Sequence, residues 1–141
     1  MNILITGSKG FIGKNLVEYL KVNSNHQIFE FSKSEDLKEL EKKINYSDFI
    51  IHLAAVNRPK NKELFKEVNI NLTKYICNLL EKKSTKTPLL FVSSIQATLK
   101  NQYGISKFEA EKIVIKLYEN NENPVFIYRL PGVFGKWCKP N

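Results

Sequence analysis

A glycine-rich turn near the beginning of the chain restricts the possible fold more than any other feature of the sequence. Residues 6–13 read Thr-Gly-Ser-Lys-Gly-Phe-Ile-Gly, directly after a short apolar run. In this TGxxGxxG pattern Gly7 permits a tight turn, Gly10 lets the backbone approach a pyrophosphate, and Gly13 lets a helix pack close to the strand. The N terminus of that helix offers N–H groups and a positive dipole end to phosphates. The turn predicts a dinucleotide site formed by Gly7, Ser8, Lys9, Gly10, Phe11, Ile12 and Gly13.

Short apolar runs alternate with helical patterns along the rest of the chain. Runs bounded by turn residues are typical of buried parallel strands, and here they comprise residues 2–6, 27–31, 48–54, 88–92 and 125–130. The segments between them carry apolar residues at helical spacing. This alternation predicts an α/β fold of the Rossmann type, a doubly wound parallel sheet of about five strands with helices on both faces. With 141 residues, 43% of them hydrophobic, residues 1–141 have room for one such domain.

The end of the second predicted strand carries a second signal. A dinucleotide-binding fold places an acidic residue about twenty residues beyond the glycines, where it binds the ribose hydroxyls of NAD. Two registers are possible in Ile28-Phe29-Glu30-Phe31-Ser32-Lys33. If Glu30 reaches the ribose, NAD is favoured. If the strand ends before Ser32 and Lys33, a hydroxyl and an ammonium lie next to the ribose. They can bind a 2′-phosphate, so NADP is favoured. We prefer the second register, because residues 28–31 have the pattern of a strand.

Tyr103 and Lys107 form a YxxxK pair at the start of the last predicted helix. Residues four apart lie on one helix face, so the phenol and the ammonium can address the same small volume. A nearby positive charge favours phenolate, so we expect Lys107 to lower the pKa of Tyr103 and make it a proton donor or acceptor near neutral pH. Upstream, a strand runs into the pair Ser93 and Ser94, where a hydroxyl can hydrogen-bond the substrate carbonyl oxygen that Tyr103 would protonate. A lone YxxxK pair is typical of solvated side chains, but the serine pair and the glycine turn favour catalysis.

Charge, hydropathy and cysteine usage exclude several other classes of protein. The net charge is +8, but the lysines are mostly mixed with glutamates on segments typical of solvated helix faces, which argues against nucleic-acid binding. A positive surface also suits an anionic nucleotide. No apolar run approaches the roughly twenty residues that span a bilayer, so we expect a soluble, cytoplasmic protein without a membrane partner. Cys77 and Cys138 lie far apart without a CxxC pair or a histidine cluster, so neither a metal site nor a disulfide is indicated.

Several motifs occur in the order and spacing of a known family. They are the glycine turn, His52-Leu53-Ala54-Ala55, Asn69-Ile70-Asn71-Leu72-Thr73, Ser93-Ser94 and the YxxxK pair. With these motifs essentially the whole chain resembles the extended short-chain dehydrogenase/reductases, the NAD-dependent epimerase/dehydratase group that acts on nucleotide sugars. The resemblance implies a catalytic triad of Ser94, Tyr103 and Lys107, supported by Asn69 on a helix.

The same resemblance implies roles for residues that pattern alone does not assign. Ser32 and Lys33 would replace the family's usual acidic residue, which supports NADP. The cofactor would also contact Leu53, Ala54 and Ala55 after the third strand, and Tyr103 and Lys107. Asn57, Arg58 and Gln96 are candidates for contacts to sugar or phosphate.

Residues 56–59, 94–98 and 134–141 resemble a narrower group within this family, the reductases of capsular-polysaccharide synthesis. These reduce a UDP-linked 4-keto-6-deoxy-hexosamine with NADPH. The resemblance implies the same activity here, with NADP as cofactor, NAD as the alternative, and a UDP-sugar as substrate. The motifs leave two other functions open, an epimerase or dehydratase of the same family and a non-catalytic NAD(P)-binding fragment.

The chain departs from the family in two places. The family commonly has an asparagine where this chain has Gly132, which implies that a contact to the substrate phosphates is missing. The family also continues beyond residue 141 with a last strand and a substrate-binding lobe, so we expect a truncated form whose cofactor half is nearly complete. Family members often form homodimers through helices that correspond here to residues 60–82 and 103–119. A homodimer is therefore expected.

Overall fold

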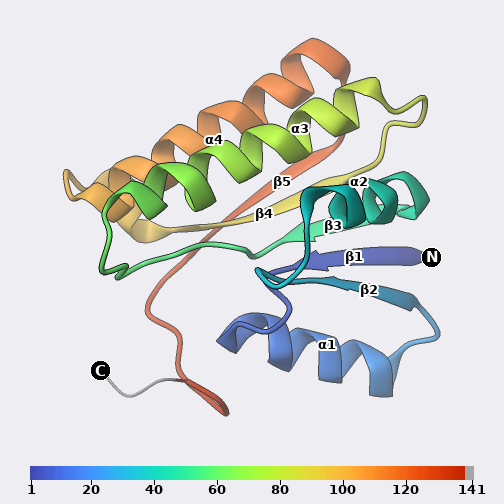
Figure 1. Ribbon diagram of the computed structural model, residues 1–141, viewed down its shortest axis with the longest axis horizontal. Coiled ribbons are helices and arrows are strands. Elements are labelled where there is room, and N and C mark those ends of the chain that lie inside the picture. The colour runs from blue at the N-terminus through green and yellow to red at the C-terminus, as the bar shows by residue number, and fades with distance from the viewer. Residues whose placement is uncertain (139–141) are drawn as a thin grey trace.

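Five parallel strands form one sheet in the computed structural model, which describes residues 1–138 (Figure 1). The strands are β1 (Asn2–Thr6), β2 (Gln27–Phe31), β3 (Phe49–His52), β4 (Leu89–Ser94) and β5 (Val125–Leu130). Their order across the sheet is β2-β1-β3-β4-β5. The predicted five-stranded, doubly wound parallel sheet is confirmed. Each of the five predicted runs contains a strand, but β3 is shorter than the run at residues 48–54. β4 extends through Ser93 and Ser94 because both serines continue the ladder with β5, opposite Arg129 and Leu130.

Helices connect the strands, and several begin at capped positions. They are α1 (Phe11–Asn23), α2 (Leu37–Tyr46), the π-helix η1 (Phe65–Asn71), α3 (Leu72–Lys82), the 3₁₀-helix η2 (Ile95–Thr98) and α4 (Gln102–Asn121). Asp36 caps α2 by accepting from the Glu39 N–H, and Asn101 caps α4 by accepting from the Gly104 N–H. Such caps satisfy amide groups that the first helical turn leaves unpaired. The segment between β3 and β4, for which the apolar spacing predicts a helix, contains two consecutive helices, η1 and α3, and η2 was not predicted.

The helices cover the two faces of the sheet unequally (Figure 1). α2, α3 and α4 pack on one face, over a core that includes Leu4, Ile50 and Phe91. α1 packs alone on the opposite face, against Ile3 and Ile5. This division follows from right-handed crossovers, because the connection from β1 to β2 runs in one direction across the sheet and the later ones run in the other.

The strand order determines at which edge of the sheet a ligand site is expected. The connections leave β1 in one direction and β3 in the other, so the crevice at the carboxyl ends of these two strands is the topological switch point where such folds bind ligands. The glycine turn, Ser32, Leu53 and Ser94 all follow or end a strand at this edge. Within residues 1–138 no helix is both long enough and apolar enough to cross a membrane.

Candidate functional site

The glycine loop between β1 and α1 is built by close backbone contacts. Gly7 has φ +70°, a left-handed conformation that favours glycine, and a Cβ there would lie 2.8 Å from the Ala54 backbone. The Gly10 N–H donates to the Gly7 carbonyl at 2.9 Å. A Cβ on Gly13 would lie 2.2 Å from the same carbonyl oxygen, so the first turn of α1 sits directly on the loop.

The N terminus of α1 has the properties of an anion site. Within the described chain no side chain caps this helix at Gly10, and its first turn contains no acidic residue. The unpaired N–H groups and the positive end of the helix dipole are therefore left for an external acceptor. These unpaired donors and the absence of an acidic residue suit an anionic group such as a pyrophosphate.

The tip of β2 brings Ser32 next to the glycine loop. The strand ends at Phe31, whose carbonyl accepts from the Ser8 N–H at 3.2 Å. The Ser32 hydroxyl lies 2.9 Å from the Ser34 hydroxyl, which also accepts from Lys9 Nζ at 3.4 Å. Lys33 is exposed beside them. Two hydroxyls and the Lys9 ammonium thus lie where the second strand ends, together with the Glu35 carboxylate, which accepts from the Ser32 N–H at 3.0 Å.

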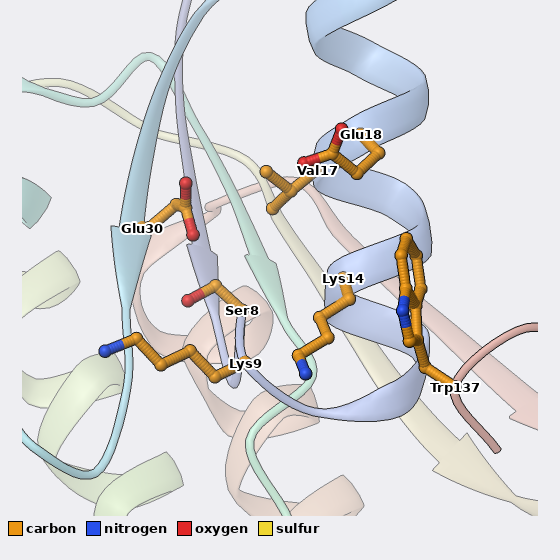
Figure 2. Close-up of a pocket in the computed structure, with 7 residues that line it drawn as sticks. All are labelled: Ser8, Lys9, Lys14, Val17, Glu18, Glu30 and Trp137. Carbon is orange, nitrogen blue, oxygen red and sulfur yellow. The ribbon is translucent and has the colours of Figure 1, made fainter.

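Glu30 of β2 lines a hollow of about 300 Å³ beside the glycine loop (Figure 2). The hollow is lined by Ser8, Lys9, Lys14, Val17, Glu18, Glu30 and Trp137. The Glu30 carboxylate accepts from Lys21 of α1 at 2.8 Å. Trp137 stands against α1 in Figure 2, and Asn15 holds this segment by donating to the Lys136 carbonyl at 2.8 Å. The Glu30 side chain is therefore held in an ion pair with Lys21 of α1.

The residues after β3 lie against the glycine loop. The Leu53 N–H donates to the Thr6 carbonyl at 3.3 Å, and the Ala54 N–H donates to Thr6 Oγ1 at 3.2 Å. Ala55 follows and is exposed. The three residues predicted to contact the cofactor therefore border the switch-point crevice next to Gly7.

Ser94, Tyr103 and Lys107 come together at the end of β4. Tyr103 and Lys107 are one turn apart on α4, and Ser94 is the last residue of β4. Burial raises the pKa of Tyr103, and a hydrogen bond with Ser94 opposes that rise. The expectation that Lys107 lowers the pKa of Tyr103 is wrong for this structure, because desolvation of the half-buried phenol outweighs the other effects.

Lys107 is directed into the protein rather than toward solvent. Only 2% of the residue is exposed. Its ammonium donates to the Val92 carbonyl at 2.7 Å and lies 4.2 Å from the centre of the Phe91 ring. Burial lowers the pKa of Lys107 to about 7, and the charge of Glu111 opposes this shift. Near neutral pH the side chain is therefore poised between its charged and neutral forms.

Asn69 connects the loop after β3 to α4. It is a buried residue of the π-helix η1. Its side chain accepts from the Val56 N–H at 2.8 Å and donates to the Val56 carbonyl at 2.9 Å. It also donates to the Ser106 hydroxyl at 2.9 Å, beside Lys107 in the sequence. Asn69 therefore fixes backbone around the triad, and none of these contacts reaches Tyr103 itself.

The three candidate substrate contacts lie on the surface. Asn57 and Arg58 are exposed in the loop after β3, and Gln96 is exposed on η2. The Gln96 N–H donates to Ser94 Oγ at 3.2 Å, and its side chain accepts from Asn101 at 3.2 Å. Gln96 is thus close to the triad, whereas Asn57 and Arg58 follow the loop that Asn69 holds.

His52 joins the glycine loop to α3 through a directed series of hydrogen bonds. Thr73 Oγ1 donates to the Asn69 carbonyl at 2.9 Å, so its contact with His52 Nε2, also at 2.9 Å, requires a proton on Nε2. Nδ1 then accepts from Thr6 Oγ1 at 2.6 Å. Burial lowers the pKa of His52 to about 3, and the charge of Lys107 acts in the same direction. The neutral imidazole is therefore part of the scaffold beneath the site.

The buried histidine predicts a pH dependence of stability. Since its pKa in the folded protein, about 3, lies below the ordinary 6.5, His52 stabilises the fold fully above pH 6.5 and progressively less as pH falls toward 3. Between about pH 7 and pH 4 its share of the loss is about 3 kcal/mol. His52→Gln should remove the contribution of His52 to this loss of stability. Urea unfolding at pH 7 and pH 4 measures the difference. His26→Gln is the control and should keep the wild-type dependence. Equal losses in His52→Gln and wild type would contradict the assignment.

Sequence reasoning did not predict Glu111 and its partners, which lie beside the triad. Glu111 is buried on α4 and accepts from Ser93 and from Arg129 of β5. A signal was present, because Glu111 follows Lys107 by the same four residues that separate Lys107 from Tyr103. Extending that spacing by one more helical turn would have placed all three side chains on one helix face.

Known proteins resemble this chain in sequence and in overall fold. A reductase from Pseudomonas aeruginosa, UDP-2-acetamido-2,6-beta-L-arabino-hexul-4-ose reductase, is 43% identical over 141 residues, which are 100% of this chain and 38% of the relative. The crystal structure of the capsular polysaccharide assembling protein CapF from Staphylococcus aureus has a TM-score of 0.86 at 42% identity, covering 100% of this chain and 37% of CapF. The chain thus spans well under half the length of either protein.

A more distant structure shows the same fold. UDP-glucuronic acid 4-epimerase from Bacillus cereus, solved in complex with NAD, has a TM-score of 0.85 at 21% identity, over 96% of this chain and 57% of the epimerase. Residues 3–141, nearly the whole chain, match the sequence pattern of the NAD dependent epimerase/dehydratase family. The chain therefore belongs to the NAD dependent epimerase/dehydratase family.

Proposed function

We propose that residues 1–141 are the NADP-binding domain of a reductase that acts on a UDP-linked 4-keto-6-deoxy-hexosamine in the synthesis of a capsular or surface polysaccharide. The observation that carries this proposal is the meeting of Ser94, Tyr103 and Lys107 at the end of β4, in a chain 43% identical to a UDP-hexulose reductase. The similarity to CapF over 100% of the chain supports the link to capsule synthesis.

The residues at the switch point fit a dinucleotide. The glycine loop and the uncapped start of α1 would hold the pyrophosphate. Ser32 and Lys33 would hold the adenosine ribose with its 2′-phosphate, and Leu53, Ala54 and Ala55 would line the opposite wall. Lys107 uses one of its three N–H donors on Val92, so the others can bond the hydroxyls of the nicotinamide ribose.

The proposed mechanism uses the triad to handle the proton and the carbonyl oxygen. When bound, the reduced nicotinamide supplies the hydride that adds to the carbonyl carbon of the sugar. Tyr103 donates its phenolic proton to the carbonyl oxygen, and the raised pKa keeps that proton on the phenol beforehand. Ser94 donates a hydrogen bond to the same oxygen and stabilises its developing charge. Asn57, Arg58 and Gln96 are proposed to contact the sugar or its phosphates from the rim of the crevice.

A chimaera tests the proposed function. In it, residues 1–141 replace the matching 38% of the Pseudomonas reductase, and NADPH absorbance is followed after addition of the UDP-4-keto-sugar. We expect the chimaera to consume NADPH. The 141-residue chain alone should bind NADPH with little or no turnover, because it lacks most of the binding energy that positions the sugar. If a folded chimaera binds NADPH but only interconverts UDP-sugars, the protein is an epimerase. If the isolated chain reduces the sugar at ordinary enzymatic rates, the domain assignment is wrong.

The cofactor preference is a separate prediction for the isolated chain. Calorimetric titration should show tighter binding of NADP than of NAD, because Lys33 and Ser32 offer a charge-assisted contact to the 2′-phosphate, with Lys9 close by. One such contact contributes roughly 1.5–3 kcal/mol, about one to two decades in affinity. Lys33→Glu should abolish the preference for NADP. Lys38→Glu makes the same charge change at an exposed position of α2 and should keep the preference. A preference for NAD that Glu30→Gln abolishes would move the ribose contact to Glu30.

A further inference from the structure

We infer that Glu111 is a positioning residue for Lys107. Together with Ser93 and Arg129 it holds a buried negative charge one helical turn beyond the lysine, and this charge favours the protonated form of the Lys107 side chain. The inference deepens the proposed function, because it concerns the lysine assigned to the nicotinamide ribose.

The Glu111 carboxylate is fixed by three donors from two strands. Oε1 accepts from the Ser93 hydroxyl at 2.5 Å and from Arg129 Nε at 2.9 Å. Oε2 accepts from the second guanidinium nitrogen of Arg129 at 2.6 Å. Only 3% of Glu111 is exposed. Burial alone would raise the pKa of Glu111, but the hydrogen bonds from Arg129 and Ser93 outweigh it and hold the pKa below its ordinary value. The carboxylate is therefore charged as well as immobile.

Glu111 and Lys107 are attached to neighbouring residues of the same strand. Lys107 donates to the Val92 carbonyl, and the next residue, Ser93, donates to Glu111. Since the two side chains are four residues apart on α4, they lie on one face of that helix against β4. In this desolvated setting Glu111 is the group that raises the pKa of Lys107 against the effect of burial.

The other groups around Lys107 do not supply this charge. His52 of β3 is held neutral, and Tyr103, one turn earlier on α4, keeps its proton. Asn69 and Thr73, from η1 and α3, are neutral hydrogen-bonding partners within the same network. Arg129 of β5 is positive and bonds Glu111 directly. Glu111 is thus the acidic member of this set.

A purely structural role for the ion pair makes a different prediction. Glu111 and Arg129 join α4 to β5, so removing the carboxylate would lower stability, but it would leave the titration of Lys107 unchanged. A charged side chain that acts on Lys107 must instead shift that titration, because an opposite charge nearby stabilises the protonated amine. The pKa of Lys107 separates the two roles.

The test is an NMR titration of the lysine side chains in the 141-residue chain, without cofactor or substrate. The Lys107 signal is assigned by its loss in Lys107→Arg. Glu111→Gln should lower the pKa of Lys107 by about one unit or more. Glu109→Gln is the matched control on the same helix, where the carboxylate is 45% exposed and pairs with Lys112, and it should leave Lys107 unchanged. A folded Glu111→Gln variant with an unaltered Lys107 pKa would overturn the inference.

Arg129→Gln provides a second test, should Glu111→Gln fail to fold. The Arg129 side chain is 40% exposed, so its loss leaves a smaller gap. Ser93 still donates to Glu111 in this variant, so the carboxylate stays charged near pH 7, where Lys107 titrates. Without the positive guanidinium this charge acts on Lys107 uncompensated, and the pKa of Lys107 should rise. No change would contradict the inference. Because the titration needs neither cofactor nor sugar, its failure is distinguishable from a failure of the proposed reductase activity.

Discussion

Tyr103→Phe in the chimaeric reductase should lower kcat by about 10²–10⁴-fold while NADPH affinity stays almost unchanged. The phenol is half-buried and hydrogen-bonded to Ser94, and its raised pKa keeps the proton available for the sugar oxygen. Phenylalanine retains the ring, including its contact with Phe65 at 6.3 Å between centroids, and removes only the proton donor. Steady-state reduction of the UDP-4-keto-sugar and separate NADPH titration measure the two effects.

The matched control for this substitution is Tyr118→Phe. Tyr118 lies on the same helix, 57% exposed, far along α4 from the triad. The Tyr118→Phe variant should keep full reductase activity. If Tyr103→Phe retains wild-type kcat, the assignment of Tyr103 as the acid is wrong. If NADPH affinity falls together with kcat, the phenol has a larger part in cofactor binding than proposed.

Gly13→Ala should destabilise the isolated chain by about 3 kcal/mol and abolish cofactor binding. The added Cβ would lie 2.2 Å from the Gly7 carbonyl oxygen and 2.8 Å from the Ser8 Cα, both parts of the backbone. Neither atom can move aside as a flexible side chain would. Relief of the clash must displace the glycine loop from α1, which removes the cradle for the pyrophosphate. Urea unfolding and calorimetric NADPH titration provide the two readouts.

Gly132→Ala is the control for the glycine experiment. A Cβ on Gly132 would meet no atom within 4 Å among the described residues, so the change in stability should stay within about 0.5 kcal/mol and NADPH should bind as before. Equal stabilities for Gly13→Ala and Gly132→Ala would show that α1 does not depend on close packing against the loop.

The sheet could be predicted from the sequence because its strands are local signals. Each is a short apolar run bounded by turn residues, and β1 is buried on both faces from Ile3 to Thr6, as its composition implies. The glycine loop was predictable for a related reason, since its geometry excludes side chains at Gly7 and Gly13. In both cases the residue type itself carries the constraint.

The polar groups beneath the site could not be predicted in the same way. A glutamate on a helix is typical of a solvated face, and Glu111 is buried only because Ser93 and Arg129, from two separate strands, meet it. The shift of the Tyr103 pKa was predicted with the wrong sign for the same reason. Spacing places Lys107 near Tyr103, but only the fold shows that both are desolvated and that the ammonium is bonded to Val92. Burial is a property of the assembled structure.

The π-helix η1 is a further feature without a local signal. Apolar residues from Phe65 to Leu79 have spacing that predicts one continuous α-helix. Asn69 in this wider turn exchanges hydrogen bonds with the Val56 backbone, which lies in a different segment. Such bulges are rare and frequently lie at functional sites. Here the bulge contains the asparagine that braces the loop after β3.

The strand order has a consequence for how the protein folds as it is synthesised. β2 pairs with β1, β3 with β1, β4 with β3 and β5 with β4, so each of the described strands after β1 finds a partner among those already made. β1 waits for β2, and each later strand can pair as soon as it emerges from the ribosome. Parallel sheets are slow to form because their contacts are non-local, and unpaired edges promote aggregation during that delay. The order of this sheet keeps that exposure short, since a nascent chain can add its strands one at a time.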